Sequence, residues 1–258
     1  MNQTERRIYL IQGLCREDSR FADIRPEQMS EEEQKNTLRG LMNIRLPAPV
    51  GDEWLAVQDD YLQQAIAEKG ITSLEQLVPV QDRLYLWQGD ITTFACDAIV
   101  NAANSELLGC FVPLHHCIDN CIHSYAGLEL RNCCERIMQQ QGHSEPAGQA
   151  KITPAYNLPC RYVLHTVGLI VNGSLTERDC ALLESCYLSC LKLAEKNGVQ
   201  SLAFCCISTG VFGFPQQEAA EIAVRTVKDY LTRTDSRMCV IFNVFQEKDR
   251  QIYQSLLG

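Results

Sequence analysis

The side chains best suited to chemistry gather in one short stretch, GCFVPLHHCIDN, which runs from 109 to 120. Thiolates and imidazoles are preferred ligands of zinc. Cys110, His115 and Cys117 have the spacing C-x4-H-x-C, which lets a folded loop place them around one ion. By spacing alone, His116 remains an alternative to His115. The stretch therefore predicts a metal site.

The number of protein ligands indicates whether such a metal does chemistry. Three ligands leave a fourth position open, as in catalytic zinc sites, whereas four ligands close the site, as in structural ones. Cys121 lies four residues after Cys117 and could join it on one helix face, so a closed site is the alternative. Asp119 could orient a water or cap the following helix, with Asn120 as the competing cap. We interpret His123 and His165 as packed histidines of a helix and a strand.

A second candidate site is the turn in CCISTGVFGFP, between an apolar strand and a helix that starts near Pro215. Gly210 and Gly213 permit close backbone approach and unusual φ angles, and Ser208 and Thr209 add hydroxyls. Amides of such a turn, next to a helix N-terminus, favour an anion. A plain strand-to-helix turn has the same composition, so both interpretations stay open.

A third candidate is Asp90, in QGDIT, which follows a predicted strand end. Its carboxylate could accept a hydrogen bond from the exocyclic amine of a base. It could equally cap the next segment, with Thr92 and Thr93 nearby. Taken alone, the capping role is favoured.

The chain from Leu84 onward predicts the elements that hold these residues. Short apolar runs alternate with helical stretches, which favours a mostly parallel sheet covered by helices on both faces. Expected strands are LYLWQGD, DAIVNAAN, two around Asn157-Leu158-Pro159, QSLAFCCIS and RMCVIFNVF; expected helices are DNCIHSYAGLELRNCCERIMQQQG, ERDCALLESCYLSCLKLAEKNG, PQQEAAEIAVRTVKDYL and KDRQIYQSLL. Ligands bind at the carboxyl ends of strands in such sheets, where Asp90, the expected loop 101–104 and residues 208–214 fall.

Residues 1–80 predict a helical extension before the α/β domain, which we place at 81–258. The segments RPEQMSEEEQKNTLRGLMNIR and GDEWLAVQDDYLQQAIAEKG carry apolar residues at helical intervals, and Gly70 can end the second helix. The extension contains no catalytic constellation.

Composition narrows the class of partner. The formal net charge is −9, which disfavours broad nucleic-acid binding. No long uncharged apolar run predicts a membrane span, and the N-terminus does not look like a secretory signal. The 14 cysteines lie largely in apolar surroundings, where free cysteine behaves as a small hydrophobe. We therefore expect a reduced, cytoplasmic protein.

Taken in order, GDIT, AIVNAAN and ISTGVFGFP make the chain from Leu84 to the C-terminus resemble a macrodomain, the ADP-ribose-binding fold. The insertion GCFVPLHHCIDNCIH and the helical first 80 residues resemble the zinc-dependent macrodomains, which are bacterial and fungal ADP-ribosyl hydrolases. The resemblance implies a three-layer α/β/α fold with a mixed, mostly parallel sheet.

The resemblance also implies roles for individual residues. Asp90 would contact the adenine amine with the Ile91 backbone beside it, and Asn101 would support the loop of Asn104, which faces the distal ribose. Asn104 and Asp119 would be the catalytic pair. The diphosphate would lie on Ser208, Thr209, Gly210, Val211 and Phe212, and the loop of Cys117, Ile118 and Asp119 would contact the ligand. Zinc would be held by Cys110, His115 and Cys117.

The implied activity is zinc-dependent removal of mono-ADP-ribose from proteins modified on acidic side chains. The resemblance points to a sirtuin-type transferase that adds the mark and to lipoyl-carrier proteins as associates. One alternative is a non-catalytic ADP-ribose-binding module with a structural zinc. Another is a phosphatase or deacetylase of small ADP-ribose conjugates.

Overall fold

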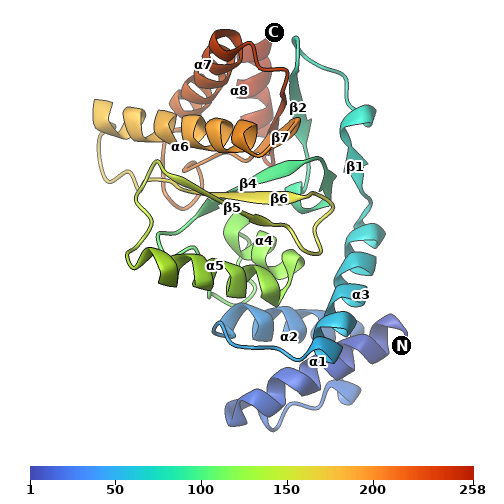
Figure 1. Ribbon diagram of the computed structural model, residues 1–258. Coiled ribbons are helices and arrows are strands. Elements are labelled where there is room, and N and C mark those ends of the chain that lie inside the picture. Colours follow the sequence, from blue (N-terminus) through green and yellow to red (C-terminus); the bar gives the residue numbers. More distant parts are fainter.

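The computed structural model describes residues 1–258, and a six-stranded sheet forms its centre (Figure 1). The strands lie in the order β2-β8-β7-β4-β6-β5. All neighbours pair in parallel except β5 with β6, which are antiparallel. The strands are β2 (Leu84–Gln88), β4 (Ala98–Ala103), β5 (Ala150–Pro154), β6 (Tyr162–Val167), β7 (Ser201–Phe204) and β8 (Cys239–Val244). The expected mixed, mostly parallel sheet is confirmed.

Helices cover both faces of this sheet. One face carries α6 (Glu177–Lys196), α7 (Gln216–Thr234) and α8 (Glu247–Leu257), and the other carries α4 (Ile118–Ala126) and α5 (Leu128–Gln141), as Figure 1 shows. The central strands are buried on both faces, which explains their continuous apolar runs. The result is the predicted three-layer α/β/α arrangement.

Three helices precede the sheet: α1 (Gln3–Glu17), α2 (Glu31–Ile44) and α3 (Asp52–Lys69). In Figure 1, α1 and α2 lie below α4 and α5, and α3 rises beside them toward β1 (Thr72–Ser73). The three helices share a separate apolar cluster that Leu128 of α5 joins, whereas Ile66 of α3 belongs to the main core. After α3, β1 pairs with β3 (Phe94–Ala95). The sequence predicts α2 and α3 but not α1. The boundary at residue 80 stays a prediction.

Two local expectations are wrong. The stretch expected as one helix up to Gly142 is two helices, α4 and α5, because Gly127 between them has φ +98° and a Cβ there would lie 2.6 Å from Gln58 Nε2. The expected loop 101–104 is mostly strand, because β4 continues through Ala103 in register with β6. Only Asn104 lies beyond the strand end.

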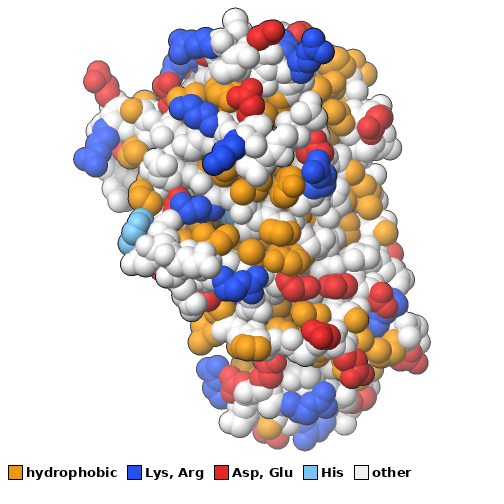
Figure 2. All heavy atoms as spheres, in the orientation of Figure 1, with side chains coloured by type: hydrophobic (Ala, Val, Ile, Leu, Met, Phe, Trp, Pro, Cys, Tyr) orange, Lys and Arg blue, Asp and Glu red, His pale blue; other side chains and the backbone are white.

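The surface in Figure 2 shows Lys and Arg side chains interspersed with Asp and Glu, without a broad basic patch on that face. All 14 cysteines are free thiols. No helix is both long enough and apolar enough to span a bilayer.

Candidate functional site

The carboxyl ends of the parallel strands meet at one edge of the sheet and bring the candidate loops together. Asp90 follows β2, Asn104 follows β4, and residues 205–215 join β7 to α7. Between Asn104 and α4 the chain forms the loop that carries the predicted metal ligands. This edge therefore collects residues far apart in sequence, as expected for a sheet of this class.

The predicted metal ligands lie together. The ligand atoms of Cys110, His115 and Cys117 are all within 4.8 Å of one another, and each residue is half-buried. Cys110 Sγ lies 3.6 Å from His115 Nδ1. Neither His116 nor Cys121 belongs to this group. Two thiols and one imidazole would suit zinc and would leave one of its four positions for water or substrate.

The second cysteine of this group begins helix α4. Cys117 is the N-cap residue, and its Sγ accepts the Asn120 N–H at 3.4 Å. Neither Asp119 nor Asn120 is the cap, so the capping alternative for these residues is wrong. Burial raises the pKa of the Cys117 thiol to about 12. A bound dication and the helix N-terminus would both oppose that shift because they stabilise the thiolate.

The loop between the ligands has a constrained backbone. Gly109, just before Cys110, has φ +81°, and a Cβ on it would lie 2.7 Å from the His123 ring. Leu114, just before His115, has φ +58°. A left-handed backbone costs an ordinary residue roughly 1–2 kcal/mol, so contacts around Leu114 must hold this turn.

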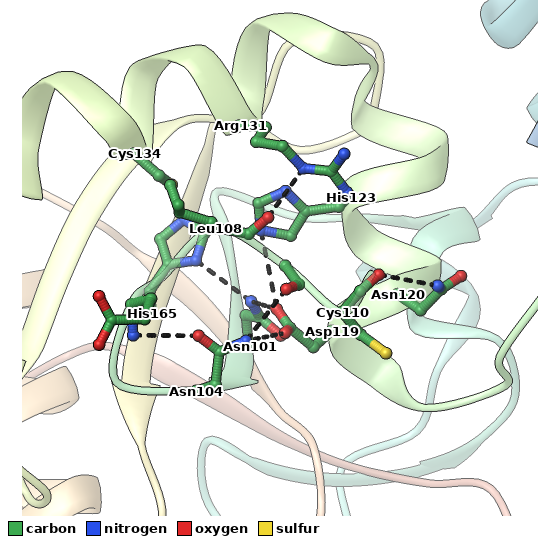
Figure 3. Close-up of polar contacts among 12 residues, drawn as sticks. Asn101, Asn104, Leu108, Cys110, Asp119, Asn120, His123, Arg131, Cys134 and His165 are labelled. Carbon is green, nitrogen blue, oxygen red and sulfur yellow. Dashed lines mark hydrogen bonds and ion pairs between the residues drawn. The ribbon is translucent and has the colours of Figure 1, made fainter. Parts of the chain in front are cut away.

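Asp119 is buried beside the metal group and is held by two asparagines (Figure 3). Asn101 Nδ2 donates to Asp119 Oδ1 at 2.8 Å, and Asn104 Nδ2 donates to Oδ2 at 3.2 Å. Burial raises the pKa of the Asp119 carboxyl to about 6, against the lowering effect of the Asn101 hydrogen bond. The fixed carboxylate can orient a hydroxyl or a water at the end of β4.

A second cluster, His123, Cys134 and His165, lies beneath this network with ligand atoms within 4.8 Å of one another. Asn101 Nδ2 lies 3.2 Å from His165 Nδ1, which must accept, so His165 Nε2 carries the proton and donates to Thr153 Oγ1 at 3.0 Å. His165 therefore has no lone pair for a metal. Burial lowers the pKa of His165 to about 4 and that of His123 well below its ordinary value. Both are packed, neutral histidines.

The turn after β7 has the shape of an anion site. Ser208 is buried with φ +66°, and its carbonyl accepts the Phe214 N–H at 3.0 Å, which curls the backbone. Gly213 has the expected unusual φ, +70°, whereas Gly210 does not. A Cβ on Gly210 would meet no atom within 4 Å. Val211 is 78% exposed at the tip, so the turn presents backbone to solvent.

The residues after β6 brace this turn. Leu169 N–H donates to Ser208 Oγ at 3.0 Å, and Val171 N–H donates to Phe212 O at 2.9 Å. A Cβ on Gly168 would lie 2.3 Å from Ser208 Oγ. The conformation of the turn is thus fixed by the residues after β6 as well as by Gly213 within the turn.

Asp90 caps the short 3-10 helix Ile91–Thr93. Its Oδ1 accepts from Thr92 N at 3.0 Å and from Thr92 Oγ1 at 2.6 Å, so the capping role is present. Its Oδ2 accepts from Lys69 Nζ of α3 at 2.9 Å. Burial raises the pKa of Asp90, but the hydrogen bonds from Thr92 and then Lys69 bring it below its ordinary value. The carboxylate stays charged at the sheet edge.

The N-terminal helices contribute polar contacts to the site that sequence reasoning missed. Lys69 reaches Asp90, Arg39 reaches the carbonyl of His115, and Asn43 reaches Leu114 N–H. Arg39 and Asn43 share one face of α2 by their four-residue spacing. The sequence offers no signal that this face meets the metal loop.

Comparison with known proteins agrees with this geometry. Residues 100–223 match the family model described as Macro domain. A protein-ADP-ribose hydrolase of Treponema medium is 57% identical over 263 aligned residues and covers 100% of both chains. One of Staphylococcus aureus (strain MSSA476) is 50% identical and covers 95% of this chain and 92% of its own.

A solved structure extends the comparison to the ligand. The Trypanosoma brucei macrodomain in complex with ADP-ribose superimposes with a TM-score of 0.67 at 29% identity, over 90% of this chain and 97% of its own. The fold and its loops define a three-layer α/β protein whose candidate site lies at the carboxyl ends of parallel strands. The chain belongs to the macrodomain family.

Proposed function

We propose that this protein is a zinc-dependent hydrolase that removes mono-ADP-ribose from modified proteins. Its relatives of 57% and 50% identity are named protein-ADP-ribose hydrolase, which supports the hydrolase activity. The observation that carries the zinc part is the three-ligand group of Cys110, His115 and Cys117 at the start of α4, two residues before Asp119.

The ligand would lie along the strand ends. Asp90 Oδ2 would accept a hydrogen bond from the adenine amine, beside the Ile91 backbone. The same oxygen also accepts a hydrogen bond from Lys69 Nζ. The exposed backbone of residues 208–212 would hold the diphosphate through amides, since successive amides in a turn favour anions. The distal ribose would then reach Asn104, Asp119 and the loop that ends at Ile118.

The protein groups near the distal ribose would position the bond that breaks. Asp119 is held by both asparagines, so its free lone pairs can accept from a ribose hydroxyl or a water. Fixed placement of reactants can supply several kcal/mol of barrier lowering, roughly 7 or more in favourable cases. Zinc held by Cys110, His115 and Cys117 would polarise an oxygen or acidify a water.

The linkage and the partners are also proposals. We propose that the mark is attached through an acidic side chain, that a sirtuin-type transferase adds it, and that lipoyl-carrier proteins are among the associated proteins. The interspersed surface charges in Figure 2 fit a protein substrate better than a nucleic acid.

The test is release of ADP-ribose from a protein modified on acidic side chains, measured before and after a strong chelator and after zinc is restored. We expect release to stop on stripping and to return with zinc. Cys117→Ala should lose both zinc binding and the release of ADP-ribose. Cys121→Ala is the matched control, because Cys121 lies outside the ligand group. It should keep both zinc binding and ADP-ribose release. Full turnover by Cys117→Ala contradicts the proposal. Tight ADP-ribose binding without release by the zinc-loaded protein would indicate a non-catalytic binding module.

A further inference from the structure

Helix α2 presents two different faces. Leu38, Leu41 and Met42 are buried in the apolar cluster shared with α1 and α3. Arg39 and Asn43 point the other way, toward the metal loop, which we define as residues 109–117. If α2 merely covered apolar surface, its loop-facing side would not need a buried asparagine and a partly buried arginine. The arrangement therefore calls for another explanation.

Asn43 holds the strained turn of the metal loop. It is 1% exposed, and its Oδ1 accepts the Leu114 N–H at 3.0 Å while its Nδ2 donates to Ser124 Oγ of α4 at 2.8 Å. Leu114 is the residue with φ +58°, and His115 follows it. Strained residues persist where their surroundings over-determine them. Asn43 supplies that restraint one residue before a metal ligand.

Arg39 holds the same loop on both sides of the turn. Its Nη2 donates to His115 O at 2.6 Å and to Asn120 Oδ1 at 2.9 Å. Asn120 Nδ2 in turn donates to Cys110 O at 3.1 Å and to Val112 O at 3.0 Å. Arg39 thus connects, directly or through one side chain, to the backbone of two metal ligands.

The opposite side of the loop faces solvent, where Val112 is 57% exposed. The loop packs on α2 closely enough that a Cβ on Gly40 would lie 4.0 Å from Pro113 Cβ. Its conformation therefore depends on a helix that lies far earlier in the chain.

We infer that α2 is a working part of the active site, and that Arg39 and Asn43 are positioning residues that hold the metal loop in the shape its ligands need. This inference rests on the proposed function, because it concerns the zinc that the loop would hold. The N-terminal extension is then required for metal affinity as well as for covering the domain.

The experiment compares Asn43→Ala with Gln58→Ala. Gln58 of α3 makes a contact of the same kind elsewhere: it is fully buried, and its Oε1 accepts the Leu128 N–H at 2.8 Å. Each variant loses two hydrogen bonds between the extension and the rest of the protein: Asn43 bonds Leu114 N–H and Ser124 Oγ, and Gln58 bonds Leu128 N–H and Glu129 Oε2. We expect Asn43→Ala to weaken zinc binding about tenfold or more, roughly 1.4 kcal/mol. Gln58→Ala should keep wild-type zinc affinity despite a similar loss of stability.

Zinc affinity is measured by competition with a chromophoric chelator, ADP-ribose affinity by calorimetry, and stability by urea unfolding of the full chain. ADP-ribose affinity should change by less than about twofold in both variants. Arg39→Gln is a second variant at a partly exposed position, for the case that Asn43→Ala does not fold. Arg39→Lys should recover zinc affinity only in part, because a single ammonium nitrogen in the place of Nη2 cannot also replace the contact of Arg39 Nε with Ser124 Oγ at 3.4 Å.

The outcomes separate the inference from the proposed function. A wild-type protein that binds no zinc overturns the proposed function itself. A wild-type protein that binds zinc, with unchanged affinity in Asn43→Ala or Arg39→Gln, overturns the inference alone. Equal losses of zinc affinity in Asn43→Ala and Gln58→Ala would mean general destabilisation and would also overturn it.

Discussion

The two glycines of the turn after β7 give the sharpest test of how ADP-ribose binds. Gly213 has φ +70°, which favours glycine whatever the ligand. Gly210 has an ordinary φ and open space around a Cβ position, so nothing in the folded protein requires glycine there. We predict that Gly210→Ala spares stability and weakens ADP-ribose binding, and that Gly213→Ala lowers stability.

The magnitudes follow from these two environments. An alanine at φ +70° costs roughly 1–2 kcal/mol of stability. An alanine at Gly210 should change stability by less than about 0.5 kcal/mol, or raise it slightly through the unfolded chain. If its Cβ displaces one amide–phosphate hydrogen bond, about 1.5–3 kcal/mol of binding is lost, which is roughly a 10- to 150-fold weaker Kd.

The assay is calorimetric titration of each variant with ADP-ribose, with urea unfolding in the same buffer. Wild-type affinity in Gly210→Ala would show that the diphosphate does not approach this backbone, and would refute the placement of the ligand. Loss of stability in Gly210→Ala equal to that in Gly213→Ala would refute the structural distinction between them.

Two further predictions concern the buried network. Asn101→Ala removes the hydrogen-bond donor to Asp119 and to His165, so we expect the protein to lose roughly 1–3 kcal/mol of stability. We also expect kcat to fall by roughly 10²-fold while the affinity for ADP-ribose is retained. A lower ADP-ribose affinity with an unchanged kcat would contradict this prediction. His165 should stay neutral at pH 5 by NMR of its ring nitrogens, since burial lowers its pKa to about 4 from 6.5. Between pH 4 and pH 6.5, His165 binds a proton in the unfolded chain but not in the folded chain. The contribution of His165 to the unfolding free energy therefore falls as the pH falls, by roughly 2 kcal/mol at pH 5. A ring that protonates near pH 6.5 would rule this out.

Much of the fold could be predicted from local patterns. The apolar run of β7 and the alternation of strands with helices indicate a parallel sheet, and the structure confirms it. The sequence analysis does not predict helix α1. The start of this helix nevertheless has a sequence signal, since Asn2 and Glu5 form a capping box. A closer reading of cap spacing would have found it.

Other features depend on contacts that no local pattern contains. The apolar spacing runs through Gly127, and the break between α4 and α5 is explained by its φ of +98° and its close packing against Gln58. The spacing in the sequence predicts a metal group with either His115 or His116, and the resemblance selects His115. The shape of the metal loop depends on Arg39 and Asn43. These lie in another element, and their target becomes visible only when the chain is folded.

The pairing of β2 with β8 joins an early part of the chain to a late one. β2 is among the first strands to leave the ribosome, yet Leu84 pairs with Val240 near the end of the chain. The metal loop and α2 are both available once α4 has been made. Because β2 pairs in the sheet only with β8, it has no partner there until residues 239–244 have been made. A nascent or truncated chain that lacks the last strand therefore exposes the edges of β2 and β7, which favours aggregation.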